Sequence, residues 1–159
     1  MFNLFKKKQM SIITSPVVGK SIALEKVADK VFADKLMGDG IAFSFEGDTI
    51  YSPCSGEIIM IAGTKHAFGI KTKNGTEILL HIGLDTVNLN GEGMEVLANN
   101  NAKIKTKDPL LRVNRKFMKE KDIDLTVVLV ITNTQDYDLV IEDPKEVNLN
   151  SIVIQTKKK

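Results

Sequence analysis

Two runs of β-forming residues on either side of an Asn-Gly pair constrain this chain's fold more than any other stretch. The runs are His66–Thr72 and Glu77–Ile82, separated by Lys73-Asn74-Gly75-Thr76. Asn-Gly between such runs is the strongest short-range hairpin signal, because both central residues of a type I′ turn need a positive φ. The sequence therefore predicts an antiparallel hairpin with Asn74 and Gly75 at its tip.

This turn also predicts which residues of the hairpin face each other. Ile70 should lie opposite Leu79, and Phe68 opposite His81, with His66 two residues further along. Facing residues share a face of the sheet, and so do residues two apart on one strand. The chain's only two histidines should then project from one face, with Cα atoms roughly 7–8 Å apart. A slip of one residue would place them on opposite faces.

The predicted face carries apolar residues where a solvated face would be polar, namely Phe68, Ile70 and Leu79. A single histidine in a strand is more often a structural residue than a reactive one. Two histidines converging on one apolar face favour the alternative that they form a reactive pair within a docking surface. Both interpretations stay open on the residues alone.

The length of 159 residues predicts a single domain over residues 11–159, preceded by a flexible basic tail over residues 1–10. No apolar run approaches the length of a membrane span, and no signal peptide is visible. The single Cys54 cannot form an internal disulfide. We therefore expect a cytoplasmic protein.

The charge is segregated along the chain. Lysines 6–8 and 157–159 contribute six of the 22 basic residues, which leaves 16 basic against 20 acidic residues between them. Nucleic acid is not an expected partner, because it would need a basic face on the folded body. The apolar and lysine-rich N-terminal tail predicts a weak contact with a membrane surface.

Many short strand-like runs predict an all-β fold, an antiparallel β-sandwich or barrel with short helical turns. Ser-Pro-x-x-Gly occurs at residues 15–19 and again at residues 52–56, which suggests two related halves. Residues 24–37 have apolar residues at helical spacing, and Gly38-Asp39-Gly40 ends that pattern. On this pattern alone, the apolar residues of that segment are more often core than binding surface.

The chemistry available is limited to the histidine pair. The chain has no Walker loop, no dinucleotide glycine fingerprint, no Cys-x-x-Cys and no His-Glu-x-x-His. Imidazole is a competent nucleophile near neutral pH and forms a phosphoramidate that can be passed on. A second imidazole beside it can donate a hydrogen bond to the phosphoryl oxygens. Such a pair suits reversible phosphoryl transfer.

Several stretches closely resemble the glucose-type enzyme IIA of the bacterial phosphoenolpyruvate-dependent sugar phosphotransferase system. They are Gly38-Asp39-Gly40, Thr64-Lys65-His66-Ala67-Phe68, the specific run Gly75-Thr76-Glu77-Ile78-Leu79-Leu80-His81-Ile82-Gly83-Leu84-Asp85-Thr86-Val87, and Leu89-Asn90-Gly91-Glu92-Gly93. The resemblance implies an antiparallel β-sandwich, or barrel-sandwich hybrid, with an internally duplicated motif. It also implies that His81 accepts a phosphoryl group from the histidine phosphocarrier protein and donates it to a cysteine of a sugar-specific IIB domain.

The resemblance further implies roles around the pair. His66 would steady the phosphoryl group, and Thr64 would orient a site imidazole. The docking surface that the resemblance implies for the partners consists of acidic and apolar residues, namely Asp29, Asp85, Val31, Phe32, Leu36 and Met37. The predicted hairpin face adds Phe68 and Leu79 to this surface. No cofactor is required, although His66 and His81 could share a zinc ion with a partner. The protein is expected to be a monomer, and regulatory protein partners are possible.

Two departures from the family pattern lie outside the histidine pair. Ala28 stands where the family usually has proline, and Met94 where it has phenylalanine. Methionine is a tolerant substitute at an apolar contact.

The sequence leaves two alternative functions open. Neighbouring histidines on a β-sandwich could hold zinc in a hydrolase, but a third ligand with an obvious spacing is lacking. A non-catalytic module that binds regulatory partners through the apolar face is the other.

Overall fold

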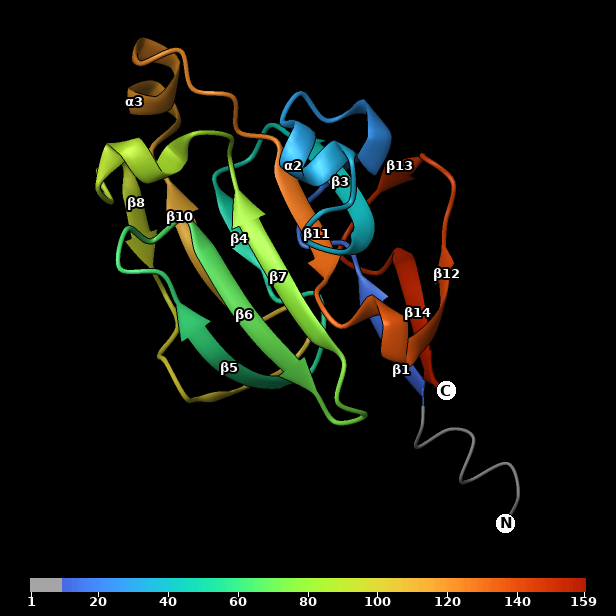
Figure 1. The fold of residues 1–159 in the computed structure, drawn as a ribbon. Coiled ribbons are helices and arrows are strands. Elements are labelled where there is room, and N and C mark those ends of the chain that lie inside the picture. The colour runs from blue at the N-terminus through green and yellow to red at the C-terminus, as the bar shows by residue number, and fades with distance from the viewer. Residues whose placement is uncertain (1–9) are drawn as a thin grey trace.

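The structure, a computed structural model, describes residues 10–159 and consists mainly of antiparallel sheets (Figure 1). The largest sheet has eight strands in the order β13 (Glu146–Val147), β2 (Gly19–Ala23), β3 (Asp39–Phe45), β11 (Val127–Ile131), β7 (Glu77–Ile82), β6 (Ala67–Thr72), β5 (Gly56–Ile61) and β9 (Lys103–Ile104). Two three-stranded sheets have the orders β4 (Thr49–Tyr51), β10 (Pro109–Val113), β8 (Met94–Val96) and β1 (Met10–Thr14), β14 (Ile152–Lys158), β12 (Tyr137–Ile141).

The helices of the described residues are short. They are η1 (Leu24–Lys26), α2 (Lys30–Ala33), η2 (Thr86–Leu89), α3 (Arg115–Glu120) and η3 (Thr134–Asp136). No helix within residues 10–159 has the length and apolar composition of a membrane span.

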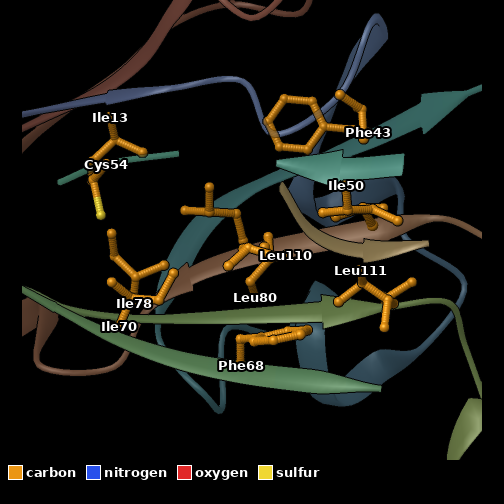
Figure 2. Close-up of a cluster of buried hydrophobic side chains, with 14 of the residues drawn as sticks. Ile13, Phe43, Ile50, Cys54, Phe68, Ile70, Ile78, Leu80, Leu110 and Leu111 are labelled. Carbon is orange, nitrogen blue, oxygen red and sulfur yellow. The ribbon is translucent and has the colours of Figure 1, made fainter. Parts of the chain in front are cut away.

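The main core lies between the large sheet and the strands that face it. Figure 2 shows Phe68 and Leu80 of the hairpin pointing toward Leu110 and Leu111, and all four side chains are fully buried. Burying side chains of this size contributes about 1.5–3 kcal/mol each. The predicted β-sandwich class is confirmed.

A second apolar cluster covers the opposite face of the large sheet. Its members are Leu24, Val27, Phe32, Ala42, Leu84, Val128 and Val130, with Leu79 packed against them. The segment predicted to be helical, residues 24–37, forms two short helices, η1 and α2, instead of one. Its Leu24, Val27 and Phe32 side chains pack on this face of the sheet. The Asp29 carboxylate caps α2 by accepting a hydrogen bond from the Val31 amide at 2.9 Å.

The two Ser-Pro-x-x-Gly segments contact each other reciprocally. The Thr14 amide donates to the Pro53 carbonyl at 2.8 Å, and the Tyr51 amide donates to the Pro16 carbonyl at 2.9 Å. Donors and acceptors are thus exchanged between equivalent positions of the repeat. This symmetry agrees with the predicted internal duplication.

The predicted hairpin forms, but its register is one residue different. Phe68 pairs with Leu80, and Ala67 pairs with His81. The loop has three residues rather than two, because the Gly75 amide bonds the Thr72 carbonyl at 3.0 Å and only Gly75, at φ +90°, takes a positive φ in the turn. The type I′ prediction is wrong, and the turn is type I followed by a left-handed glycine.

The predicted N-terminal tail lies outside the described residues except at its last position. Met10 belongs to β1 and pairs with Lys157 of β14. The last residue of the predicted tail, Met10, is therefore part of a strand.

Candidate functional site

His81 stands on β7, in the middle of the large sheet, on the face covered by the second cluster. Its neighbours in the ladder are Val128 on β11 and Ala67 on β6. The ring of Phe32 lies against it with 5.0 Å between ring centroids. His81 Nδ1 is buried and makes no hydrogen bond of regular geometry among residues 10–159, although the Gly83 backbone lies close enough to favour the protonated ring, so Nε2 is the nitrogen left to meet a ligand.

His66 reaches the same site from the loop before β6. Regular pairing would place it with Ile82, whose amide donates to the His66 carbonyl at 2.7 Å, on the core face. The chain leaves the ladder here, and Lys65 adopts φ +66°. The His66 and His81 rings lie 5.0 Å apart between centroids, edge to face at 76°. The predicted convergence is confirmed, although the register used to predict it was wrong.

Thr64 lies within hydrogen-bond distance of the His66 ring. Its Oγ1 lies 2.7 Å from His66 Nδ1, a hydrogen bond in which the histidine tautomer decides the donor. With Nδ1 engaged in this way, Nε2 of His66 is available to the site. The pair therefore presents one Nε2 from each ring.

Both rings favour the neutral form. Burial lowers the pKa of His66 below its ordinary value, and the Thr64 backbone opposes this. Burial lowers the pKa of His81 as well, and His66 lowers it further, while Gly83, Asp29 and Asp85 act in the opposite direction. A neutral imidazole keeps a lone pair for attack on phosphorus.

The residues predicted as a docking surface divide into exposed and buried groups. Val31 on α2, and Leu36 and Met37 shortly after α2, expose 44%, 72% and 41% of their surface, and α2 also carries Phe32, whose ring lies against His81. Two predictions need correction. Phe68 is fully buried in the main core because of the altered register, and Phe32 is 5% exposed because it packs on His81 and the second cluster.

The other predicted docking residues are placed as follows. Leu79 is half-buried and packs on the second cluster. Asp29 is half-buried and Asp85 exposed, and both act electrostatically on His81. One further exposed apolar residue follows His81 in the sequence and was not among the predicted docking residues: Val87 on η2, which is 48% exposed. Its place at the end of the quoted His81–Val87 run was the available signal.

The chain matches the family model for the phosphoenolpyruvate-dependent sugar phosphotransferase system, EIIA 1, over residues 11–137. It belongs to this enzyme IIA family. The glucose permease IIA from Mycoplasma capricolum is a similar solved structure, with 36% sequence identity and a TM-score of 0.86. The match covers 92% of this chain and 95% of that one.

This enzyme IIA is a phosphotransferase component that carries phosphoryl groups in sugar uptake. Membership of the family implies interaction with the phosphocarrier protein and with IIB or permease components. The comparisons give no support to the zinc hydrolase alternative. Within residues 10–159, no three or more His, Cys, Asp and Glu side chains gather to hold a metal.

The turn after His81 in this enzyme IIA depends on Gly83 and Thr86, which sequence reasoning did not single out as site residues. Thr86 is fully buried and donates from Oγ1 to the Ile82 carbonyl at 2.6 Å. Gly83 has φ +77°, and a Cβ added there would lie 2.4 Å from Thr86 Cγ2 and 3.1 Å from the Asp124 carbonyl oxygen. Only glycine fits without a shift of the backbone that carries His81.

Gly83→Ala should destabilise the protein by about 1–3 kcal/mol, because it combines an unfavourable φ with a steric clash. The measurement is denaturant unfolding. Gly63→Ala is the matched control, since nothing lies within 4 Å of a Cβ added there. Equal stability of the two variants would contradict this role for Gly83.

Proposed function

We propose that His81 is the residue that carries the phosphoryl group, through its Nε2. The observation that supports this most directly is the arrangement of the pair, with Nδ1 of His81 buried and the His66 ring 5.0 Å away between centroids. One nitrogen of His81 is then directed to the opening of the site. His66 stands beside the position that a phosphoryl group on that nitrogen would occupy.

In the forward step, the neutral Nε2 of His81 attacks phosphorus in the phosphohistidine of the histidine phosphocarrier protein. An N–P bond forms on His81 as the N–P bond to the carrier imidazole breaks, and that imidazole leaves with the electron pair. His66 then donates a hydrogen bond from Nε2 to a phosphoryl oxygen, while Thr64 holds its Nδ1. Charge stabilisation and positioning are the main contributions a protein makes to phosphoryl transfer.

In the second step, a cysteine thiolate of the sugar-specific IIB domain attacks the same phosphorus. An S–P bond forms and the N–P bond to His81 breaks, which regenerates the neutral imidazole. We assign docking of both partners to exposed apolar side chains, namely Val31, Leu36, Met37 and Val87. Both steps take place where the partner excludes water, which protects the phosphoramidate from hydrolysis.

The acidic residues near His81, and a zinc ion shared with a partner, are both compatible with phosphoryl transfer at this site. Asp29 and Asp85 stand near His81 and suit basic side chains of a docked partner. This chain supplies only two histidines to a zinc ion, so a shared zinc site would need a partner's carboxylate or another partner ligand. The transfer steps themselves need no metal, and we place the protein in the cytoplasm with its partners.

The proposal is tested by incubating the protein with phosphoenolpyruvate, enzyme I and the phosphocarrier protein, followed by mapping of the modified residue. Phosphate on the peptide that contains His81 is the expected result. Phosphate confined to the His66 peptide, or absent from both, would refute the assignment.

Titration of the two imidazoles by NMR should give midpoints below the ordinary histidine value of about 6.5. Both pKa values are lowered in the folded protein, chiefly by burial. The unfolded chain therefore binds more protons than the folded chain between the lowered and ordinary values. Folding stability should fall as the pH drops through that window and should not change further, from these groups, below it.

The double variant His66→Gln, His81→Gln is the control for the pH effect. It should lose the part of the stability change that falls between pH of about 6.5 and the measured midpoints. Imidazole midpoints above the ordinary value would contradict the burial that the structure gives to both rings.

A further inference from the structure

Lys65 has an uncommon backbone conformation directly before His66. Its φ is +66°, in the left-handed region that lysine rarely adopts. The Lys65 amide donates to the Ala62 carbonyl at 2.8 Å, and the Ala62 amide donates to the Ala67 carbonyl at 2.9 Å. Residues 62–65 thus form the turn that joins β5 to β6. A strained residue persists where its surroundings compensate for the strain, and the Lys65 side chain makes contacts of this kind.

The Lys65 side chain reaches the segment between η2 and β8. Its methylene groups cover Gly91, since a Cβ added to Gly91 would lie 3.2 Å from Lys65 Cδ and 3.4 Å from Cε. Lys65 Nζ lies 3.5 Å from the Met94 carbonyl oxygen, which is long for a hydrogen bond. Figure 1 shows the loop between β5 and β6 beside the segment that leads from η2 to β8. The side chain therefore bridges two loops, chiefly through the packing of its stem.

The segment beneath this side chain is itself fixed. The Met94 amide donates to the Gly91 carbonyl at 3.3 Å, and the Asn114 amide donates to the Gly93 carbonyl at 2.8 Å. A Cβ added to Gly93 would lie 2.4 Å from Phe117 Cδ1, so the segment packs closely against α3. The bridge therefore ends on a part of the molecule that is held in place by other contacts.

The other end of the bridge is the turn that leads into His66. Nothing lies within 4 Å of a Cβ added to Gly63, so the turn is open at that position. Thr64 Oγ1 lies 2.7 Å from His66 Nδ1, but both residues belong to the turn or follow it directly, and this contact moves with them. The Lys65 stem is the side chain that ties the turn to a distant segment.

We propose that Lys65 is a positioning residue for His66, and that its stem, packed over Gly91, fixes the turn that directs the His66 ring toward His81. The inference rests on the role proposed above for His66, which is to donate a hydrogen bond to the phosphoryl group. The two imidazole rings lie 5.0 Å apart between centroids. A shift of the turn would move His66 away from a group carried by His81, and a misplacement of 1 Å can cost about 10²-fold in rate.

The first test measures transfer from phosphorylated His81 to the IIB cysteine in single-turnover assays. Lys65→Gly removes the side chain without backbone strain, because glycine adopts a positive φ freely. It should slow this step by about tenfold, which is less than the effect of removing the His66 imidazole altogether. Lys65→Met keeps the stem over Gly91 and should stay within about threefold of the wild type.

Lys157→Ala is the matched control for the loss of a lysine. Lys157 is exposed on β14, in a sheet separate from the one that carries the histidine pair, and its replacement should leave the transfer rate unchanged. A wild-type rate for Lys65→Gly, or a Lys65→Met protein as slow as Lys65→Gly, would overturn the proposal.

A double-mutant cycle distinguishes positioning of His66 from a general effect on the fold. In a His66→Ala protein, adding Lys65→Gly should change the transfer rate by less than about twofold, because the group that Lys65 positions is no longer there. A tenfold loss in both backgrounds would contradict the proposal, since Lys65 would then act on His81 or on the docking of the partner.

The last test does not depend on phosphoryl transfer. In ¹⁵N NMR of the unphosphorylated protein, Lys65→Gly should shift the ring nitrogens of His66 more than those of His81, and Lys65→Met should restore the wild-type positions. Unchanged His66 signals in Lys65→Gly would refute the positioning role. Shifted His66 signals in a protein that carries no phosphoryl group on His81 would support the positioning role and refute only the proposed function.

Discussion

His81→Ala should abolish phosphorylation of this enzyme IIA by the phosphocarrier protein. The substitution removes the Nε2 to which we assign the phosphoryl group, and the Nε2 of His66, oriented through the hydrogen bond between Thr64 and its Nδ1, is assigned to stabilise that group rather than to carry it. Loss of a covalent nucleophile typically costs about 10⁴-fold or more in rate. Transfer of radiolabelled phosphate from phosphoenolpyruvate through enzyme I and the phosphocarrier measures it.

A control is needed because His81 is part of the packed face of the sheet. Its ring contacts Phe32, so an alanine there leaves space beside the second cluster. His81→Gln keeps more of this volume and should be as inactive as His81→Ala while unfolding closer to the wild type. Label that remains on either variant at the wild-type level would contradict the assignment of His81 as the phosphoryl carrier.

His66→Ala should slow transfer from phosphorylated His81 to the IIB cysteine by about 10²–10³-fold, the usual cost of removing one transition-state donor. Acceptance from the phosphocarrier should suffer less. The nucleophile in that step is a neutral imidazole, whereas the IIB thiolate brings a further negative charge to the transition state. Single-turnover assays started from each phosphorylated donor separate the two steps.

Thr64→Val provides the graded control for His66. It removes the hydroxyl 2.7 Å from His66 Nδ1 but leaves the imidazole in place, so its effect should be smaller and in the same direction. Equal slowing of both steps by His66→Ala would assign His66 a general structural role instead. An unaffected second step would contradict the donor role.

The hairpin shows how far local signals reach. Two strands, an antiparallel turn and convergent histidines followed from the pattern around Asn74-Gly75, but the register did not. The Asn74 side chain accepts hydrogen bonds from Ser11 Oγ at 2.7 Å and from Thr76 Oγ1 at 2.7 Å, and its carbonyl accepts one from Tyr137. Ser11 and Tyr137 are distant in sequence, so these tertiary bonds select the three-residue loop over the shorter one.

The one-residue difference in register explains why the predicted position of Phe68 was wrong although the predicted convergence of the two histidines was right. Phe68 obeys the alternation of β6 and therefore turns into the core. His66 does not obey it, because the left-handed Lys65 lies between the preceding turn and the strand. A lysine in that conformation has no local sequence signal, since it is not a residue that favours positive φ.

Other parts of the site depend on contacts that a pattern cannot specify. The sequence predicts Phe32 both as a core residue, from the helical spacing, and as a docking residue, from the family resemblance. Its ring packs on His81 and is buried, so the core prediction is the correct one. Gly83 and Thr86 matter because of a close approach between them that only three-dimensional packing reveals. Val31, Leu36 and Met37 were placed correctly on the surface by the family resemblance, against the core interpretation of their spacing.

The most direct test of the central claim is NMR of the phosphorylated, ¹⁵N-labelled protein, which shows which ring nitrogen of which histidine is bonded to phosphorus. The structure buries Nδ1 of His81 and leaves Nε2 to the site. We therefore predict a single N–P bond at His81 Nε2. Phosphorus on Nδ1 of His81, or on either nitrogen of His66, would contradict it.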